Sequence, residues 1–478
     1  MNANEFSTFD AVALSHFIES KKVSPHELMQ SSISLAQKVN EKLHFLCHEK
    51  FDESLELSKQ WVHRGAFRGV PFLLKDSGVA SKRFPSSLGS QLFKDSRFGF
   101  DSTLVQRFDR AGFIPFARTT VPEFCMATTS EATVYAEPTR NPWDPSRSPG
   151  GSSGGAAAAV AAGVVPVAHG SDGGGSIRIP AACCGVYGYK PSRGLVPMGP
   201  TRGEGWGGLA VDGVLSRTVR DTAVAMDEIA GYEAGAPYAA PQFPEKFAQA
   251  IQTKQGQKLR IGVWRDGFKG VDIAPEALQA LEKTVQLCKD LGHDVIDMAT
   301  PDFNYASYTQ AHADILSASI VYSVETKLGL LGRALQISDL ERSIYTGYEH
   351  GKTLPAASYV AAINTLHQVG RWMAGCMADI DILMTPALNR LPEKLGVFTM
   401  DVEYFELRKK IAQYTCFIAM VNASGQPAAT LPTYWTAEGL PMSTQIIGHF
   451  GQDDLVLALS AQIEATGQWH PAHHRYVI

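Results

Sequence analysis

The spacing of apolar and polar positions predicts helices at the start of the chain and a buried strand after them. Residues 8–62 have a helical pattern, and Ser24-Pro25-His26-Glu27 has the form of a capping box with proline at the first helical position. The run of residues 69–76 is apolar until it ends in Lys75 and Asp76. This pattern is typical of a buried strand that presents two charged side chains at its end.

The rest of the chain alternates between strand-like and helical patterns. A helix is expected at 103–112 and a short strand at 113–117. Further strands are expected at 164–168, 259–264, 380–384, 428–434 and 444–447, and further helices at 156–162, 217–231, 275–292, about 305–380 and 452–466. This alternation predicts an α/β fold, and the long helical stretch at about 305–380 predicts a helical insertion.

Glycine is concentrated in one part of the chain. Residues 141–215 contain 18 of the 43 glycines and only nine charged residues in 75 positions. A flexible linker would have a similar composition, but the helix-forming run Ala156 to Ala162 and the strand-like run Val164 to Ala168 lie between the glycine clusters. The glycines therefore predict tight turns and close approach of backbone segments.

Composition and charge narrow the classes of function. Of the 478 residues, 45% are hydrophobic and 19% are charged, which is typical of a globular protein. The net charge of −5 provides no cationic field, so neither nucleic acid nor a membrane is an expected partner. Seven cysteines, an odd number, indicate reduced thiols. The N-terminus is polar, and no stretch of 18 apolar residues occurs. We therefore expect a cytoplasmic protein.

The histidines do not predict a metal site. His44 and His48 lie four residues apart on an expected helix, with Cys47 between them, and such a pair is usually a surface or core-edge feature. A solvated tail is expected to hold a second group of histidines, namely His470, His473 and His474. These histidines therefore predict no metal site.

Three segments have the residue types that acyl-transfer chemistry needs. They are Lys75-Asp76, Ser148 to Gly155, and Ser171 to Pro180. Each places a nucleophile or a base beside bare backbone, whose N–H groups can hold an oxyanion. A serine nucleophile needs a base, and a lysine that burial keeps neutral can serve.

These segments resemble the amidase signature family, whose hallmark is a Ser–cis-Ser–Lys triad within a Gly/Ser-rich stretch. The resemblance extends to further segments: Thr139 to Asp144, Gly188 to Pro191, Leu215 to Asp221 and Gly439 to Pro441. Within the family, Pro166 to Gly170 and Ser424 to Ala428 are most similar to bacterial amidases of the 6-aminohexanoate-cyclic-dimer hydrolase type. The resemblance implies one α/β/α unit around a mixed sheet over residues 1–478, with an N-terminal helical segment at 1–66 and a signature core at 67–235.

The resemblance also implies a role for individual residues. Ser176 would be the nucleophile that accepts the acyl group, Ser152 the bridging serine after a cis peptide bond, and Lys75 the base. Ser153 would orient the triad. The oxyanion hole would consist of four backbone N–H groups, those of Gly173, Gly174, Gly175 and Ser176. Met126 and Thr128 are candidates for the substrate pocket, because they precede the Gly-rich segment.

A lysine base imposes a physical condition. Only about 1 in 2,500 free lysines is neutral at pH 7, and lowering the pKa to about 7 takes roughly 4–5 kcal/mol of preference for the neutral amine. Burial beside two serines supplies such a preference if no carboxylate pairs with the amine. Asp76 should therefore point to the other face of the strand. Amide hydrolysis is then expected to rise with pH.

The expected function is hydrolysis of a small-molecule amide through an acyl-enzyme on Ser176. The mechanism that the resemblance implies requires no metal and no cofactor. One alternative is the A subunit of a tRNA-dependent glutamine amidotransferase complex, which has the same triad and acts with partner subunits. A second alternative is a family member that binds ligands without catalysis. A homodimer is compatible with the sequence.

Overall fold

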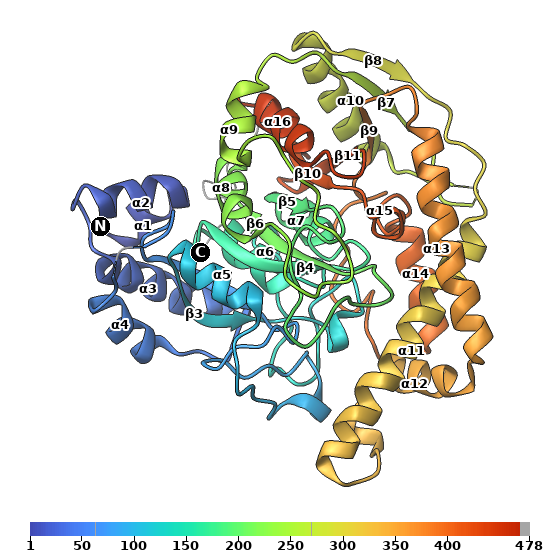
Figure 1. Cartoon of the computed structure of the whole chain (residues 1–478), viewed down its shortest axis with the longest axis horizontal. Coiled ribbons are helices and arrows are strands. Elements are labelled where there is room, and N and C mark those ends of the chain that lie inside the picture. Colours follow the sequence, from blue (N-terminus) through green and yellow to red (C-terminus); the bar gives the residue numbers. More distant parts are fainter. Residues whose placement is uncertain (63, 269, 469–478) are drawn as a thin grey trace.

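The computed structural model describes residues 1–62, 64–268 and 270–468, so the three tail histidines lie outside the described part of the chain. An eight-stranded sheet forms the centre of the molecule, in the order β4-β6-β5-β10-β11-β9-β7-β8 (Figure 1). Its strands are β4 (Val167–Asp172), β5 (Tyr187–Lys190), β6 (Val211–Ser216), β7 (Arg260–Val263), β8 (Asp294–Asp297), β9 (Ile382–Pro386), β10 (Ala428–Trp435) and β11 (Pro441–Gly448). Neighbours are antiparallel from β4 to β9 and parallel from β9 to β8, which confirms the predicted mixed sheet.

Helices cover both faces of this sheet. Successive side chains along a strand point to opposite faces, and apolar side chains occur on each face, so both faces need cover. Leu431 and Ile446 belong to the core on the face of α8, α10 and α16, whereas Ala428 and Ile447 belong to the core that includes α13 and α15. These helices are α8 (Val219–Ile229), α10 (Pro275–Asp290), α13 (Ala356–Cys376), α15 (Met420–Ser424) and α16 (Asp453–Glu464). The arrangement confirms the predicted α/β/α class.

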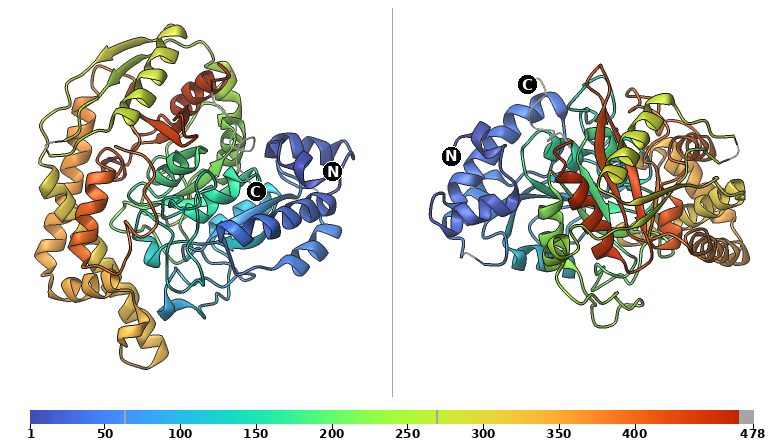
Figure 2. Two further views of the ribbon diagram at one scale, coloured as in Figure 1. Left: turned by 180° about the vertical axis from the view of Figure 1, so that it is seen from behind. Right: turned by 90° about the horizontal axis from the view of Figure 1, so that it is seen from above.

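The N-terminal helices and the insertion lie at opposite ends of the molecule (Figure 1, Figure 2). The N-terminal group consists of α1 (Ala3–Phe6), α2 (Ala11–Glu19), α3 (Pro25–Leu43) and α4 (Phe51–Lys59). The capping box before α3 forms as predicted: the Glu27 N–H donates to Ser24 Oγ, and the Ser24 N–H donates to the Glu27 carboxylate. The insertion consists of α11 (Tyr305–Leu331), α12 (Arg342–Thr353) and α13. No helix in the described part of the chain is long and apolar enough to cross a bilayer.

A small second sheet brings Lys75 to the site. It has the order β1-β3-β2, with strands β1 (Leu46–Cys47), β2 (Val70–Lys75) and β3 (Phe113–Thr119). The strands expected at 69–76 and 113–117 are therefore confirmed. Lys75 is the last residue of β2, where it pairs with Thr119 of β3.

Further helices connect the two sheets and surround the Gly-rich segment. They are α5 (Thr103–Ala111), α6 (Gly154–Ala161), α7 (Arg178–Cys184), α9 (Phe247–Thr253), α14 (Tyr404–Tyr414) and the short 3-10 turns Gln91–Phe93, Glu123–Cys125 and Ile337–Asp339. Every residue of α6 is buried, which its glycine and alanine residues allow because they have little or no side chain.

Two local predictions are wrong. The strand expected at 164–168 is displaced to β4, because the polar residues 169–172 belong to the strand and the apolar pattern does not mark them. His44 and His48 do not share a helix: α3 ends at Leu43, His44 adopts left-handed φ as its C-cap, and Cys47 lies in β1. The patterns also missed β1, β5, β6, β8, α9, α14 and α15, all of which are short or lie in segments without clear periodicity.

Candidate active site

Lys75 is fully buried, and its amine is surrounded by serine oxygens. Its Nζ lies 2.7 Å from Ser152 Oγ, 2.8 Å from Ser171 Oγ and 3.2 Å from the Ser171 carbonyl oxygen. Burial lowers the pKa of Lys75, and the negative charges of Asp212 and Asp172 oppose this effect in part. The site therefore favours the neutral amine more than water does.

His169 on β4 fixes the backbone that carries Lys75. The Lys75 N–H donates to His169 Nδ1 at 3.2 Å, and His169 Nε2 lies 3.1 Å from Asp212 Oδ1. Nδ1 is thus an acceptor, which leaves the ring proton on Nε2 to be donated to Asp212. Burial lowers the pKa of His169 and keeps the ring neutral. This chain of contacts ties β2 to β4 and β6 at the site.

The hydrogen-bond donors to the Asp76 carboxylate do not include the Lys75 amine. Its carboxylate accepts hydrogen bonds from Ser86 Oγ (2.6 Å), the Ser87 N–H (2.9 Å) and Tyr135 OH (2.8 Å). Burial alone would raise the pKa of Asp76, but His48 and the buried Arg118 hold it well below its usual range. The negative charge of Asp76 is therefore balanced by groups other than Lys75.

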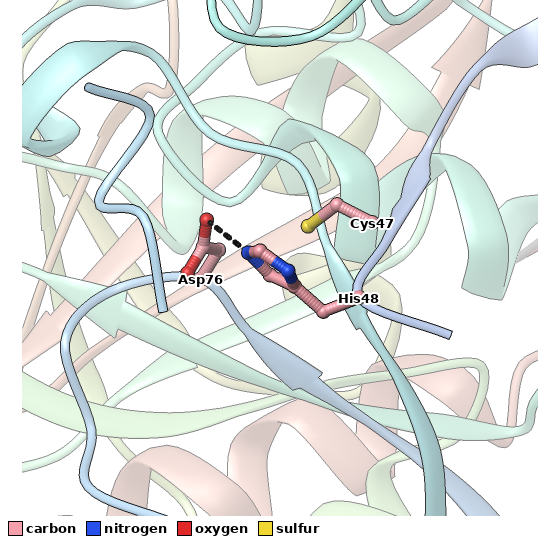
Figure 3. A group of neighbouring side chains, drawn as sticks. All are labelled: Cys47, His48 and Asp76. Carbon is pink, nitrogen blue, oxygen red and sulfur yellow. Dashed lines mark ion pairs between the residues drawn. The ribbon is translucent and has the colours of Figure 1, made fainter. Parts of the chain in front are cut away.

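Cys47, His48 and Asp76 form a compact group in the part of the chain that the structure describes, and each offers an atom of a type that binds metals (Figure 3). His48 Nε2 lies 3.6 Å from Asp76 Oδ2. Two observations argue against a cation here: protein donors already occupy the Asp76 carboxylate, and the positive charge of Arg118 acts on both Asp76 and Cys47. The group fits a structural role at the edge of the small sheet.

Ser152 and Ser153 lie in the turn that leads into α6. The Gly151–Ser152 peptide bond is cis. A Cβ atom on Gly151 would lie 2.1 Å from the Thr129 carbonyl oxygen, so only glycine fits this position. The Ser153 N–H donates to the Ser176 carbonyl oxygen at 3.1 Å, which joins this turn to the loop that carries Ser176.

A buried ion pair shapes the loop between β4 and α7, where Ser176 lies. Arg178 Nε and Nη2 each donate to the Asp172 carboxylate at 2.9 Å. The same carboxylate accepts from the Gly175 N–H at 2.7 Å and the Ile177 N–H at 3.2 Å. Burial would raise the pKa of Asp172, but Arg178 holds it well below its usual range. Gly175 has a φ of +117°, a conformation that favours glycine.

This geometry bears on the expected oxyanion hole. The Gly175 N–H points to Asp172 and is already used within the protein. The N–H groups of Gly173, Gly174 and Ser176 are the other members of the expected set. An oxyanion hole on this loop would therefore depend on these three, with Asp172 fixing the shape of the turn.

Two cavities meet at Ser176. The narrow cavity has a volume of about 60 Å³, and both candidate pocket residues, Met126 and Thr128, line it together with Tyr308, His312 and Arg408. The wide cavity has a volume of about 450 Å³ and is lined by Ser152, Ser171, Asp212 and residues of α11. Cys125, Ser176 and Trp206 line both cavities. Ser176 retains 9% exposure and Ser152 none, so Ser176 is the more accessible of these two serines.

Several residues around the site were not singled out from the sequence. Ser171, Asp172 and Arg178 lie within a segment that was noted only for its glycines and serines. A strand end followed by an Asp–Arg pair six residues apart was the available signal. Tyr308 and Arg408 come from α11 and α14, and no local pattern could have connected helices so distant in sequence to Ser176.

Comparison with known proteins agrees with this architecture. The model of the family described as Amidase matches residues 27–457. The 6-aminohexanoate-cyclic-dimer hydrolase of Paenarthrobacter ureafaciens is 33% identical over 476 residues, covering 96% of this chain and 95% of that protein.

Solved structures give the same result. A structure of 6-aminohexanoate cyclic dimer hydrolase superposes with a TM-score of 0.90 at 31% identity, covering 98% of both chains. A bacterial aryl acylamidase of the amidase signature family has a TM-score of 0.88 at 27% identity, covering 98% of this chain and 99% of that one. The A subunit of the glutamyl-tRNA(Gln) amidotransferase of Thermotoga maritima is more distant, with a TM-score of 0.77 at 26% identity, covering 96% of this chain and 95% of that one. The chain therefore belongs to the amidase signature family and is an amide-hydrolysing enzyme.

Proposed function

We propose that amide hydrolysis here proceeds through a Ser176–Ser152–Lys75 triad and an acyl-enzyme on Ser176. The proposal rests on the groups that surround the Lys75 amine. A neutral amine has two N–H donors and one lone pair. Ser171 offers two acceptors for the two N–H groups, and Ser152 Oγ lies 2.7 Å away, where its hydroxyl can donate to the lone pair.

In the first half of the reaction, the proton moves from Ser176 to Ser152 while Ser152 gives its own proton to Lys75. Ser176 Oγ attacks the amide carbonyl carbon, and the backbone N–H groups of Gly173, Gly174 and Ser176 stabilise the oxyanion. The C–N bond then breaks as Ser152 passes a proton to the leaving amine and recovers one from Lys75. Water cleaves the ester on Ser176 by the same relay and releases the carboxylic acid.

The two cavities receive different halves of the substrate. Ser152 lines the wide cavity and not the narrow one, and it must protonate the leaving amine. The amine therefore leaves through the wide cavity, and the acyl group enters the narrow cavity beside Met126 and Thr128.

The test is hydrolysis of a panel of linear, cyclic and aryl amides and of glutamine by wild type, Ser176→Ala and Ser171→Ala. Wild type should hydrolyse simple amides, Ser176→Ala should lose at least about 1,000-fold in kcat/KM, and Ser171→Ala should lose less. A serine-directed fluorophosphonate should modify Ser176 in wild type. Near-normal activity of Ser176→Ala, or modification at another serine, would overturn the proposal.

The same panel tests the alternative of an amidotransferase component, which the distant likeness to such a protein keeps open. An enzyme that acts alone should hydrolyse amides other than glutamine without added proteins. Activity limited to glutamine would support the amidotransferase instead.

A further inference from the structure

The narrow cavity contains polar atoms that nothing in the protein satisfies. Thr128 Oγ1, Tyr308 OH and Arg408 Nε are buried and have no hydrogen-bond partner among the described residues. Thr128 is 4% exposed and Tyr308 is 2% exposed, and all three side chains line this cavity. Buried polar groups are nearly always paired, so atoms left unpaired in a substrate cavity indicate a polar ligand.

Arg408 determines which kind of polar ligand fits. Its guanidinium donates to the Met126 carbonyl oxygen and lies 5.5 Å from the centre of the Tyr404 ring. None of the ion pairs found in the described part of the chain includes Arg408. Arg408 is partly exposed as a whole, but its Nε is buried. A guanidinium only donates hydrogen bonds, so this free Nε–H needs an acceptor, and an anion is the strongest acceptor for it.

The neighbours of Arg408 do not provide that anion. Burial and the positive charge of Arg408 lower the pKa of His312 to about 4, with a small opposing effect from the Gly173 backbone, so the His312 ring is neutral at neutral pH. Thr128 and Tyr308 carry hydroxyl groups, which are neutral at that pH and can donate hydrogen bonds. The cavity thus presents one positive charge, two hydroxyl groups and the neutral His312 ring, whose Nε2 is also buried without a partner among the described residues.

We propose that the narrow cavity binds a carboxylate on the acyl part of the substrate, with Arg408 as its charge partner and Thr128 and Tyr308 as hydrogen-bond donors. The preferred substrates are then monoamides of short dicarboxylic acids. This inference rests on the proposed function, because it places the acyl group in the narrow cavity. A volume of about 60 Å³ holds roughly four water-sized groups, enough for a carboxylate and one or two methylene groups.

Succinamate and succinamide form a matched pair of substrates, since they are nearly equal in shape and differ by one negative charge. Wild type should show a higher kcat/KM for succinamate. Arg408→Met should lower the succinamate-to-succinamide ratio on the order of 100-fold, and Arg408→Lys should lower it less. Arg342→Met is the control: Arg342 lies on the exposed side of α12, pairs with Glu403 and should leave the ratio unchanged. A wild-type ratio of one or less, or a ratio unaffected by Arg408→Met, would overturn the inference.

A binding measurement separates this inference from the proposed mechanism. Succinate should bind the Ser176→Ala protein in isothermal titration, and adding Arg408→Met should weaken that binding on the order of 100-fold. Succinate binding that depends on Arg408 in a protein that hydrolyses no amide would support the cavity assignment and contradict the mechanism. Amide hydrolysis without succinate binding would support the mechanism and contradict the cavity assignment.

Discussion

At the scale of single residues, the proposed mechanism depends most on Lys75. Its position at the end of a strand was predictable from a run of apolar residues that ends in charge, and its proposed role as the base comes from the family resemblance. The surroundings of its amine were not predictable, because the Ser171 hydroxyl that hydrogen-bonds it and the Asp212 charge that acts on its pKa come from strands far apart in sequence. The same reason hid Arg408 and Tyr308.

The lowered pKa of Lys75 predicts how activity depends on pH. A general base works only when deprotonated, so kcat/KM should rise as pH increases through the pKa of Lys75 and level off above it. The measurement is kcat/KM for a simple amide from pH 5 to pH 10. Lys75→Met should remove both the activity and the pH dependence. A flat wild-type profile, with chemistry shown to be rate-limiting, would exclude the neutral lysine.

The same shift predicts an effect on stability. Because the pKa of Lys75 is lower in the folded than in the unfolded chain, the unfolded chain binds more protons between those two values, and this residue destabilises the fold as pH falls. Lys75→Met removes that penalty. The melting temperature of Lys75→Met relative to wild type should therefore be higher at pH 6 than at pH 10. An offset that does not vary with pH would show that Lys75 is charged in the folded protein.

At the scale of elements, the loop from β4 to α7 is a turn built around one carboxylate. The sequence predicted a Gly-rich turn carrying Ser176, but it placed the preceding strand too early, since residues 169–172 are polar. Side chains from this polar stretch contact Lys75 and Arg178. The residues for which the apolar pattern failed to predict a strand are therefore part of the candidate site.

Breaking the buried pair of Asp172 and Arg178 should be costly. Arg178→Met would leave the Asp172 carboxylate buried without its partner, and we expect a loss of about 3–5 kcal/mol in the free energy of unfolding. The control is Arg220→Met, which removes the ion pair with Asp10 where the Arg220 side chain is 52% exposed, and it should cost about 1 kcal/mol or less. Urea unfolding measures both. Equal losses in the two variants would contradict this account of the loop.

At the scale of the whole molecule, the order of strands departs from their order in the chain. The α/β class and most strands were predictable from local patterns, but their order was not, because it depends on pairing between distant segments. β10 and β11 sit between β5 and β9, so the late part of the chain joins the two halves of the sheet. We propose on this basis that the chain forms one cooperative unit.

Calorimetry tests that proposal. The protein should unfold in a single transition, and a chain that ends before Ala428 should lack one, because it loses the strands at the centre of the sheet. Removal of the N-terminal helices is the comparison. These helices lie at one end of the molecule and not at its centre, so a chain without them should keep its transition (Figure 1). Two resolved transitions in the intact protein would show that the halves of the sheet fold separately.

The late position of β10 and β11 also matters while the protein is being made. A ribosome synthesises the chain from its N-terminus, so β4, β5 and β6 emerge more than 200 residues before β10, which is the neighbour of β5 in the sheet. Until then β5 offers an unpaired edge, and unpaired edges invite association with other chains. Ser176, the proposed nucleophile, is translated early, but the groups that β10, β11 and α15 place around its loop follow only near the end of synthesis. The central sheet can therefore be completed only after most of the chain has been synthesised.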